Sequence, residues 1–420
     1  MASNIVYVDP AAKANGNGSI ARPFNSWSGV NFQPSTTYLQ LAGTTSHGNL
    51  IIGNSATGAS PVQIGSYGNG SAPVIAGSVV FNDASNVSLT GFTITGGQAA
   101  GVIIQNGSGN ISLASNTIED SSVGVWLGNG AAGGDTISGN TIAGNSLFGI
   151  GISEVINPAG QATTISGNTI SDNGSHGIEL DGSNFVVQGN VVLQNGQTAA
   201  GSSGIHVYAS GSGDLGGDDN VITGNLVAGT NVVGNEDGNG IELDQWTSDN
   251  TVSGNTICGN DGSGITLYDS SGNTISANLV FCNDAMPNGN PSADGEIVLA
   301  SSFGLTSDNT ISGNLFAGIS PYAPVASVDG MSSTLGNTFS GNIFEDFGAL
   351  AMYDWAGVSG GDASFWRTVT GGSDVFAGVM PSSNTGSGGA AYSFDSVFTA
   401  SPLGPDFRFP WQTSDAYGGA

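Results

Sequence analysis

Three neighbouring segments of the chain carry side chains that can transfer protons. Each begins with glycine and then alternates apolar and polar residues: residues 177–181 (GIELD), 204–208 (GIHVY) and 240–244 (GIELD). Carboxylates, imidazole and phenol are the usual general acids and bases of enzymes. The catalytic residues that we expect from these segments are Glu179, Asp181, His206, Tyr208, Glu242 and Asp244.

The alternation predicts that these six side chains share one face. Side chains alternate across a strand, so the third and fifth residues of each segment should point the same way. Stacked strands lie ~4.8 Å apart, and same-face neighbours on one strand lie ~6.7 Å apart, which gives a patch roughly 10 Å high. Carboxylates this close raise one another's pKa unless a cation or His206 relieves them. The alternative is a solvated acidic strip.

Flat side chains and two long insertions surround the three segments. We expect sugar-stacking and substrate-binding roles for Trp126, Trp246, Tyr268 and His176, or partly buried spacers between coils. The insertions at residues 209–220 and 228–239 should form the walls of a groove. Their Asp218, Asp219 and Asp237 could bind calcium, although no EF-hand spacing is present.

A second repeat indicates what positions these segments. The phrase Thr-Ile-Ser-Gly-Asn ends at Asn140, Asn168 and Asn314, with close variants ending at Asn225, Asn255 and Asn342. With looser copies, the intervals between these asparagines run from 22 to 36 residues, which suits a coil of three short strands. Gly and Asn tolerate the left-handed backbone of a sharp corner, and stacked Asn side chains can hydrogen-bond from coil to coil.

With this ladder, the chain resembles the right-handed parallel β-helix group of pectate-lyase-like proteins. The resemblance also rests on VYVDP at residues 6–10, PVQIG at 61–65 and PVIAG at 73–77. It implies an all-β, single-stranded right-handed parallel β-helix. It also implies action on a polysaccharide, but the group includes lyases, hydrolases, epimerases, tailspikes and adhesins, so the fold does not fix the reaction.

The repeats predict three regions. Residues 1–75 should form an N-terminal cap with the first coils, residues 76–355 the β-helix, and residues 356–420 a capping segment rich in Gly, Ser, Phe and Trp. A solenoid exposes its core at each end and therefore needs such caps.

The composition limits the partners. With 32 acidic and 4 basic residues the net charge is −28, which excludes nucleic acid. No run of about 18 apolar residues could span a membrane, and the start of the sequence lacks the regions of a signal peptide. We nevertheless expect an extracellular or cell-surface polysaccharide-binding protein, either a monomer or a side-by-side homo-oligomer. Cys258 and Cys282 are too few for a disulfide framework.

Three functions remain open at this stage. The favoured one is an inverting glycoside hydrolase that needs no cofactor, with Glu179 or Glu242 as acid and Asp181 or Asp244 as base, because the spacings above lie nearer the inverting range. The second is a lyase or C5-epimerase on a uronate polymer, calcium-dependent or not, with His206 as base and Tyr208 as acid. The third is a glycan-binding or surface protein without catalysis.

Overall fold

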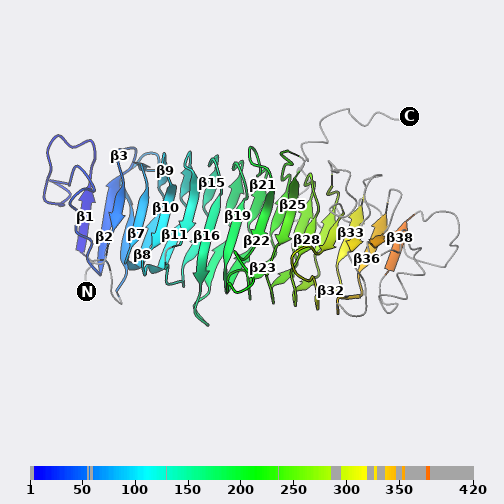
Figure 1. Ribbon diagram of the computed structural model, residues 1–420. Coiled ribbons are helices and arrows are strands. Elements are labelled where there is room, and N and C mark those ends of the chain that lie inside the picture. The colour runs from blue at the N-terminus through cyan, green and yellow to red at the C-terminus, as the bar shows by residue number, and fades with distance from the viewer. Residues whose placement is uncertain are drawn as a thin grey trace, which may run out of the picture.

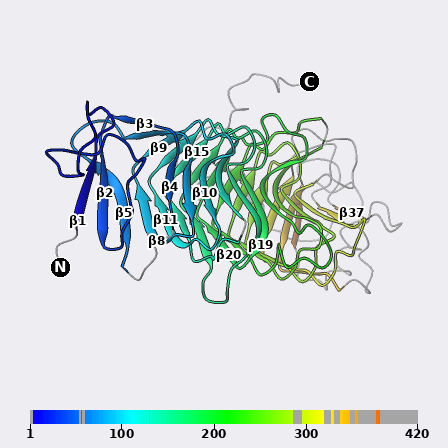
Figure 2. The ribbon, with the colours of Figure 1, turned by 60° about the vertical axis from the view of Figure 1, so that its left-hand side comes forward.

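The structure is a long stack of short parallel strands. The computed structural model describes residues 4–53, 56, 60–128, 130–234, 236–284, 295–318, 326–328, 336–346, 352–354 and 375–378. These residues form three parallel sheets and no α-helix. The strands follow one axis from β1 (blue) to β38 (orange) in Figure 1, and Figure 2 shows successive coils one behind another. The predicted all-β parallel β-helix is therefore confirmed.

Each coil contributes one strand to each sheet. The first sheet contains β1 (Asn4–Val8), β2 (Thr36–Leu41), β5 (Val62–Tyr67), β8 (Ser85–Thr90), β11 (Gly109–Ala114), β14 (Thr136–Ser138), β17 (Thr163–Ser166), β20 (Phe185–Gln188), β23 (Val221–Thr223), β26 (Thr251–Ser253), β29 (Thr274–Ser276), β32 (Thr310–Ser312) and β35 (Thr338–Ser340). The second sheet contains β3 (Thr45–His47), β6 (Val74–Ala76), β9 (Thr93–Thr95), β12 (Thr117–Glu119), β15 (Thr141–Ala143), β18 (Thr169–Ser171), β21 (Val191–Leu193), β24 (Leu226–Ala228), β27 (Thr256–Cys258), β30 (Leu279–Phe281), β33 (Leu315–Gly318), β36 (Ile343–Asp346) and β38 (Val375–Gly378). The third sheet contains β4 (Leu50–Ile52), β7 (Val79–Asn82), β10 (Ala100–Gln105), β13 (Val123–Leu127), β16 (Ile150–Ile156), β19 (Ile178–Ser183), β22 (Ser202–Val207), β25 (Asp237–Leu243), β28 (Ile265–Tyr268), β31 (Ile297–Ala300), β34 (Ala326–Val328) and β37 (Met352–Asp354).

Apolar residues from all three sheets fill the inside of the coil. In the first sheet, for example, Ile137, Ile165 and Val187 follow one another in register and are fully buried. Isoleucine and valine suit these positions because branched side chains pack well on a pleated surface. Removal of this apolar surface from water is the main force that stabilises the stack.

Asparagine ladders hold each of the three corners. At the corner between the first and second sheets, Asn140 Nδ2 donates to Asn168 Oδ1 at 3.0 Å, and the pattern continues as predicted to Asn342. A second ladder, including Asn145 and Asn173, lies between the second and third sheets. A third ladder lies between the third and first sheets, with members Asn220, Asn250, Asn273, Asn309 and Asn337. The Thr-Ile-Ser-Gly-Asn repeat predicted only the first of these three ladders.

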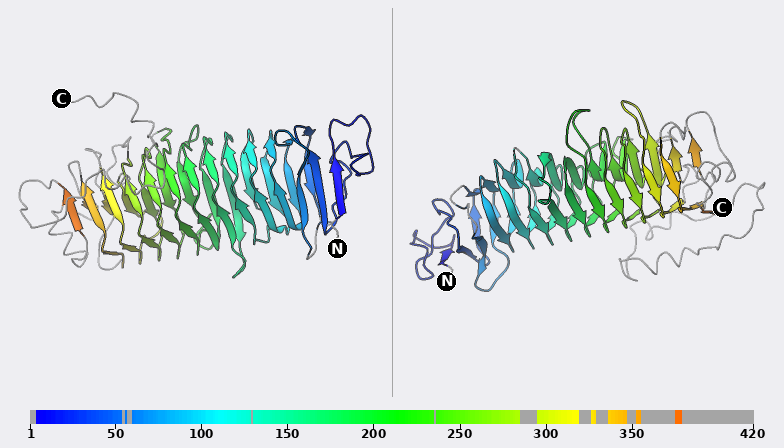
Figure 3. Two further views of the ribbon diagram at one scale, coloured as in Figure 1. Left: turned by 180° about the vertical axis from the view of Figure 1, so that it is seen from behind. Right: turned by 90° about the horizontal axis from the view of Figure 1, so that it is seen from below.

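The predicted regions remain expectations at both ends. Strands β2 to β5, all within residues 1–75, already contribute to the three sheets. Strand β38 pairs with β36, so a strand of the stack lies inside the predicted cap at 356–420, and the rest of that range lies outside the described residues. The views in Figure 3 show the same continuous stack from behind and from below.

The part of the chain that the structure describes contains no helix of the length and hydrophobicity that a membrane crossing requires. Cys258 and Cys282 are both buried, and neither forms a disulfide.

Candidate functional site

The third sheet brings the predicted site residues into one column. Glu179 on β19 pairs in register with His206 on β22, and His206 pairs with Glu242 on β25. The column continues to Gly151 on one side and to Thr266 on the other. The register that the three glycine-led segments predicted is therefore confirmed.

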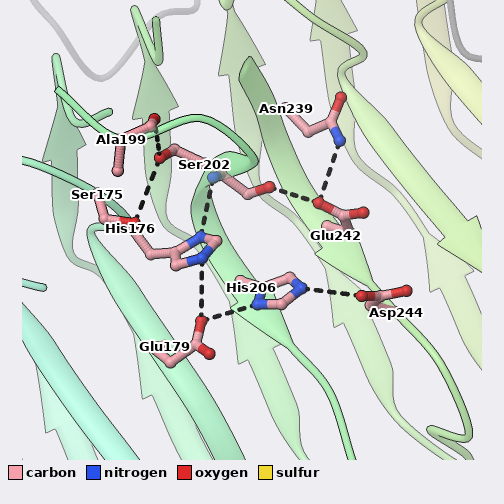
Figure 4. Close-up of polar contacts among 10 residues, drawn as sticks. Ser175, His176, Glu179, Ala199, Ser202, His206, Asn239, Glu242 and Asp244 are labelled. Carbon is pink, nitrogen blue, oxygen red and sulfur yellow. Dashed lines mark hydrogen bonds and ion pairs between the residues drawn. The ribbon is translucent and has the colours of Figure 1, made fainter. Parts of the chain in front are cut away.

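Glu179, His206 and Asp244 form a chain of polar contacts. Glu179 Oε2 lies 2.7 Å from His206 Nδ1, and Asp244 Oδ2 lies 3.3 Å from His206 Nε2, so both ring nitrogens face a carboxylate (Figure 4). Burial alone would lower the pKa of His206, but the charge of Glu179 and the hydrogen bonds to Asp244 and Glu179 outweigh it and raise the pKa well above its ordinary value. The ring is therefore an imidazolium at neutral pH, donating from both nitrogens.

His176 adds a second imidazole to this group. Its ring stacks on the His206 ring with centroids 4.5 Å apart and planes 8° apart, and its Nε2 lies 3.3 Å from Glu179 Oε2. Burial and the neighbouring His206 charge lower the pKa of His176 to about 4, so His176 is neutral. Burial would raise the pKa of Glu179, but the two histidines, His206 first, hold it below its usual value. Glu179 is therefore a carboxylate.

Glu242 is held by two neutral donors. Ser203 Oγ donates to Glu242 Oε2 at 2.5 Å. Asn239 Nδ2 donates to the same oxygen at 3.1 Å (Figure 4). Burial, together with the charge of Asp244, raises the pKa of Glu242 above its usual value, although His206 opposes this. Since both bonds engage Oε2 as an acceptor, Oε1 is the oxygen that a proton on Glu242 would occupy.

The acidic side chains of the patch are less exposed to solvent than the strand alternation predicted. Glu179 and Glu242 are only 8% and 7% exposed, and Asp181 is 2% exposed. Asp181 lies under the 209–220 insertion, where a Cβ added at Gly216 would come within 2.3 Å of its Oδ1. The interpretation as a solvated acidic strip is therefore wrong, and so is the expectation that Asp181 faces an open groove. Burial, followed by the charge of Asp214, raises the pKa of Asp181 to about 6.

The aromatic residues lie around the cluster. Tyr208 stacks on His206 with ring centroids 5.3 Å apart, and burial followed by the charge of Glu179 raises its pKa to about 12. Trp126 covers Gly151 in the same column, since a Cβ added at Gly151 would meet the indole at 2.8 Å. Trp246 and Tyr268 are partly exposed. Trp246 lies just after β25, and Tyr268 is the last residue of β28. Their substrate-binding roles stay predictions.

The predicted calcium ligands do not come together. Asp237 begins β25, whereas Asp218 Oδ1 accepts a hydrogen bond from the backbone of Ser248, beyond the end of that strand. Asp219 precedes β23 with Asp218, and its side chain is exposed. The length of β25 therefore separates Asp237 from Asp218 and Asp219, and calcium binding near either insertion stays a prediction.

Two groups within the cluster have a spacing that metal ligands also show, namely His176 with Glu179 and His206, and His206 with Glu242 and Asp244. Atoms of His206, Glu242 and Asp244 lie within 4.8 Å of one another. The hydrogen-bond directions fit a proton-sharing cluster, however, because His206 Nε2 faces Asp244 Oδ2 and two donors already occupy Glu242 Oε2. We therefore describe these atoms as a proton network.

Two functional residues were missed by the sequence analysis. Ser203 and Asn239 each precede the glycine of a site segment, as His176 does. A polar residue stands immediately before the glycine in four successive segments, the fourth being Ser263 before Gly264, whereas apolar residues precede Gly101, Gly124 and Gly149. This run was a readable signal. The hydrogen bonds of Ser203 and Asn239 to Glu242 depend on a β-bulge that no periodicity reveals.

Two family models match the chain. The model described as "Right handed beta helix region" matches residues 77–245, which include all six predicted catalytic residues. The model described as "Periplasmic copper-binding protein (NosD)" matches residues 200–354. No curated protein sequence matches the chain significantly.

The arrangement of His176 and His206 does not fit a copper centre. Copper sites rely on imidazole and sulfur ligands, and imidazole binds a metal in the plane of its ring. The rings of His176 and His206 are stacked and nearly parallel, so an ion between their nitrogens would lie out of the plane of at least one ring. His176 Nδ1 also accepts a hydrogen bond from the backbone N–H of Ser203 at 2.9 Å. No step below uses copper.

Solved structures with different activities share the fold. The A-module of mannuronan C-5 epimerase AlgE4 from Azotobacter vinelandii is 17% identical, with coverage of 77% of this chain and 91% of its own and a TM-score of 0.56. A mannuronic acid specific polysaccharide family 6 lyase from human gut microbiota is 14% identical, with coverage of 90% and 92% and a TM-score of 0.54. The GH136 lacto-N-biosidase from Eubacterium ramulus is 12% identical, with coverage of 82% and 68% and a TM-score of 0.52. Identities this low establish the architecture alone, and together with the strand topology and the family models they show that the chain has the right-handed parallel β-helix fold.

Proposed function

We propose that this protein hydrolyses glycosidic bonds of a polysaccharide, with Glu242 as the acid and Asp244 as its partner carboxylate. The observation that carries the proposal is the state of Glu242. Two donors hold its Oε2, no hydrogen bond within the described residues engages its Oε1, and burial raises its pKa. A buried neutral carboxyl beside a carboxylate is the arrangement that glycoside hydrolysis requires.

The chemistry follows from these two groups. Glu242 Oε1–H transfers its proton to the glycosidic oxygen as the bond to the anomeric carbon breaks. Asp244 carries a negative charge that the His206 imidazolium stabilises through Nε2, and it meets the positive charge that develops on the sugar. Glu179 on the far side of His206 keeps the imidazole charged and oriented.

The separation of the two carboxyl groups revises the expected stereochemistry. Oxygens of Glu242 and Asp244 lie within 4.8 Å, whereas inverting enzymes separate the two groups by about 6.5–9.5 Å and retaining enzymes by about 5–5.5 Å. These oxygens approach more closely than the ~6.7 Å spacing of same-face neighbours on a strand, from which inversion was expected. This spacing supports attack of Asp244 on the anomeric carbon to give a glycosyl ester as the leaving oxygen takes the Glu242 proton. Water, deprotonated by the Glu242 carboxylate, then displaces Asp244 in a second inversion, so the configuration is retained.

The same geometry weighs against elimination or epimerisation. A base that removes the C5 proton must be unprotonated, but His206 is held as an imidazolium between two carboxylates. Tyr208, the expected acid, has a high pKa and lies stacked on the His206 ring. A polyanionic uronate would also be repelled by a chain of net charge −28. A neutral polysaccharide outside the cell or on its surface is the substrate class that we propose.

A screen of neutral and acidic polysaccharides tests the proposal. Reducing-sugar release without ultraviolet-absorbing unsaturated ends is expected, and proton NMR of the first product should show retention of the anomeric configuration. Unsaturated ends would assign the site to elimination, altered uronate stereochemistry in uncut polymer would assign it to epimerisation, and unchanged polymer throughout would leave only glycan binding.

Matched variants then test the residue assignment. Glu242→Gln should lower kcat by about 10²- to 10⁴-fold, because the amide cannot donate the proton. Glu119→Gln makes the same chemical change on β12 in the second sheet and should leave kcat unchanged. Full activity of Glu242→Gln would refute the assignment.

A further inference from the structure

Ser203 lies between His176 and Glu242 and is hydrogen-bonded to both. It is fully buried, and it precedes Gly204 at the start of the segment that carries His206. Its backbone N–H donates to His176 Nδ1, and its side-chain Oγ–H donates to Glu242 Oε2. Within the described part of the chain, no other residue is hydrogen-bonded to both of these side chains.

The backbone contact determines the tautomer of His176. Because Nδ1 accepts a hydrogen bond at 2.9 Å, the neutral ring carries its proton on Nε2. Nε2–H then points to Glu179 Oε2 at 3.3 Å. Glu179 Oε2 therefore receives donors from both stacked imidazoles.

The side-chain contact depends on a β-bulge. Ser202 pairs with Asp237 and Ser203 pairs with Asn239, so Gly238 is the extra residue in β25. Its φ of 85° and its close approach to Val232, where an added Cβ would come within 2.5 Å, require glycine. The bulge places Asn239 opposite Ser203, and both side chains donate to the same oxygen of Glu242.

We propose that Ser203 is a positioning residue that assigns both protons of the site, the one on His176 Nε2 and the one on Glu242 Oε1. By donating to Glu242 Oε2, it leaves Oε1 as the oxygen that gives its proton to the substrate. Ser203 does not touch the reacting atoms. The proposal rests on the proposed role of Glu242, but it concerns proton positions that can be measured without turnover.

The test uses NMR of selectively labelled, full-length protein. The chain contains three histidines and seven glutamates, so ¹⁵N-histidine and ¹³Cδ-glutamate spectra are simple. In the unmodified protein, His176 should be the Nε2–H tautomer, and the Nδ1–H tautomer would overturn the backbone half of the proposal. This measurement needs no variant.

Ser203→Ala tests the side-chain half. Loss of a hydrogen bond to the charged form should raise the titration midpoint of Glu242 by about one pH unit. Ser202→Ala removes an equally buried hydroxyl one residue away, which bonds Ala199 O and Ser175 Oγ and not Glu242, and should leave that midpoint unchanged. The charged neighbours of Glu242, namely His206, Asp244 and Asp237, are the same in both variants.

The outcomes separate this proposal from the proposed function. An unchanged Glu242 midpoint in Ser203→Ala, or equal shifts in both serine variants, would overturn the positioning role. Ser203→Thr keeps a hydroxyl and should keep the midpoint of the parent protein. A shift in Ser203→Ala without cleavage of any polysaccharide would uphold the positioning role and reject hydrolysis. With an active substrate, Ser203→Ala should lower kcat and leave KM unchanged.

Discussion

Replacement of Asp135 by asparagine should stabilise this protein, and increasingly so as the pH rises. Asp135 occupies a position of the third corner ladder that asparagine fills in later coils. Its Oδ1 accepts a hydrogen bond from the backbone N–H of Ile111 at 2.8 Å, as Asn220 Oδ1 does from Phe185. Asn220 also donates from Nδ2 to Gly182 O, whereas Asp135 Oδ2 is buried without a partner in the described structure. At this position the ladder has room for a hydrogen-bond donor, which an asparagine amide supplies and the Asp135 carboxylate does not.

The size of the effect follows from burial. Asp135 is 1% exposed, and burial raises its pKa from 3.8 to about 7. A difference of about three pH units, at about 1.4 kcal/mol each, corresponds to about 4 kcal/mol. Because the folded state binds this proton more tightly than the unfolded state, the cost is absent below pH 3.8, grows as the pH rises, and is complete above pH 7.

Urea unfolding from pH 4 to pH 8 measures this effect. The difference in the free energy of unfolding between Asp135→Asn and the parent should increase by about 4 kcal/mol across this range. Asp172→Asn, which makes the same chemical change at an exposed corner with φ of 56°, is the matched control. A flat difference for Asp135→Asn would refute the reasoning, because it would show that Asp135 does not bind a proton preferentially in the folded state.

Two further predictions concern the coil contacts and the site. Gly204→Ala should destabilise the fold by about 1–3 kcal/mol, because the new Cβ would lie 2.4 Å from Val227 Cγ1 and 2.8 Å from Gly240 O. Gly211→Ala is the control, because its new Cβ would meet nothing within 4 Å, and it should have no effect on urea unfolding. Equal stability of the two variants would contradict the tight stacking. EDTA should leave both the melting temperature and polysaccharide cleavage unchanged, because protons rather than a metal join His206 to Asp244. Loss of either that is restored by a divalent cation would contradict the proton network.

The column of site residues could be predicted because two short-range rules determine it. Alternation along a strand determined which residues share a face, and the glycine at the start of each segment determined the register. At Gly177, for example, the packed carbonyl of Gly204 leaves no room for a side chain. Glu179, His206 and Glu242 were therefore predicted to be neighbours on adjacent strands, and the structure places them so.

What could not be predicted depends on irregular backbone. The bulge at Gly238 brings Ser203 and Asn239 to Glu242, and a bulge leaves no periodic signal in a sequence. The insertion that buries Asp181 has no period either, so its path over the sheet was not readable. The second and third ladders were overlooked because the residues around their asparagines vary more than Thr-Ile-Ser-Gly-Asn.

The insertions between strands leave the stack itself unchanged. Between β22 and β23 the chain runs through the long connection that covers Asp181, yet Val186 still pairs with Val221 and Val187 with Ile222. Each strand hydrogen-bonds only the coils directly before and after it, so a connection can lengthen without a change in any neighbour's register. Specificity can therefore evolve by insertion and deletion at these corners, at little cost in folding, while the proton network on the sheet is inherited intact.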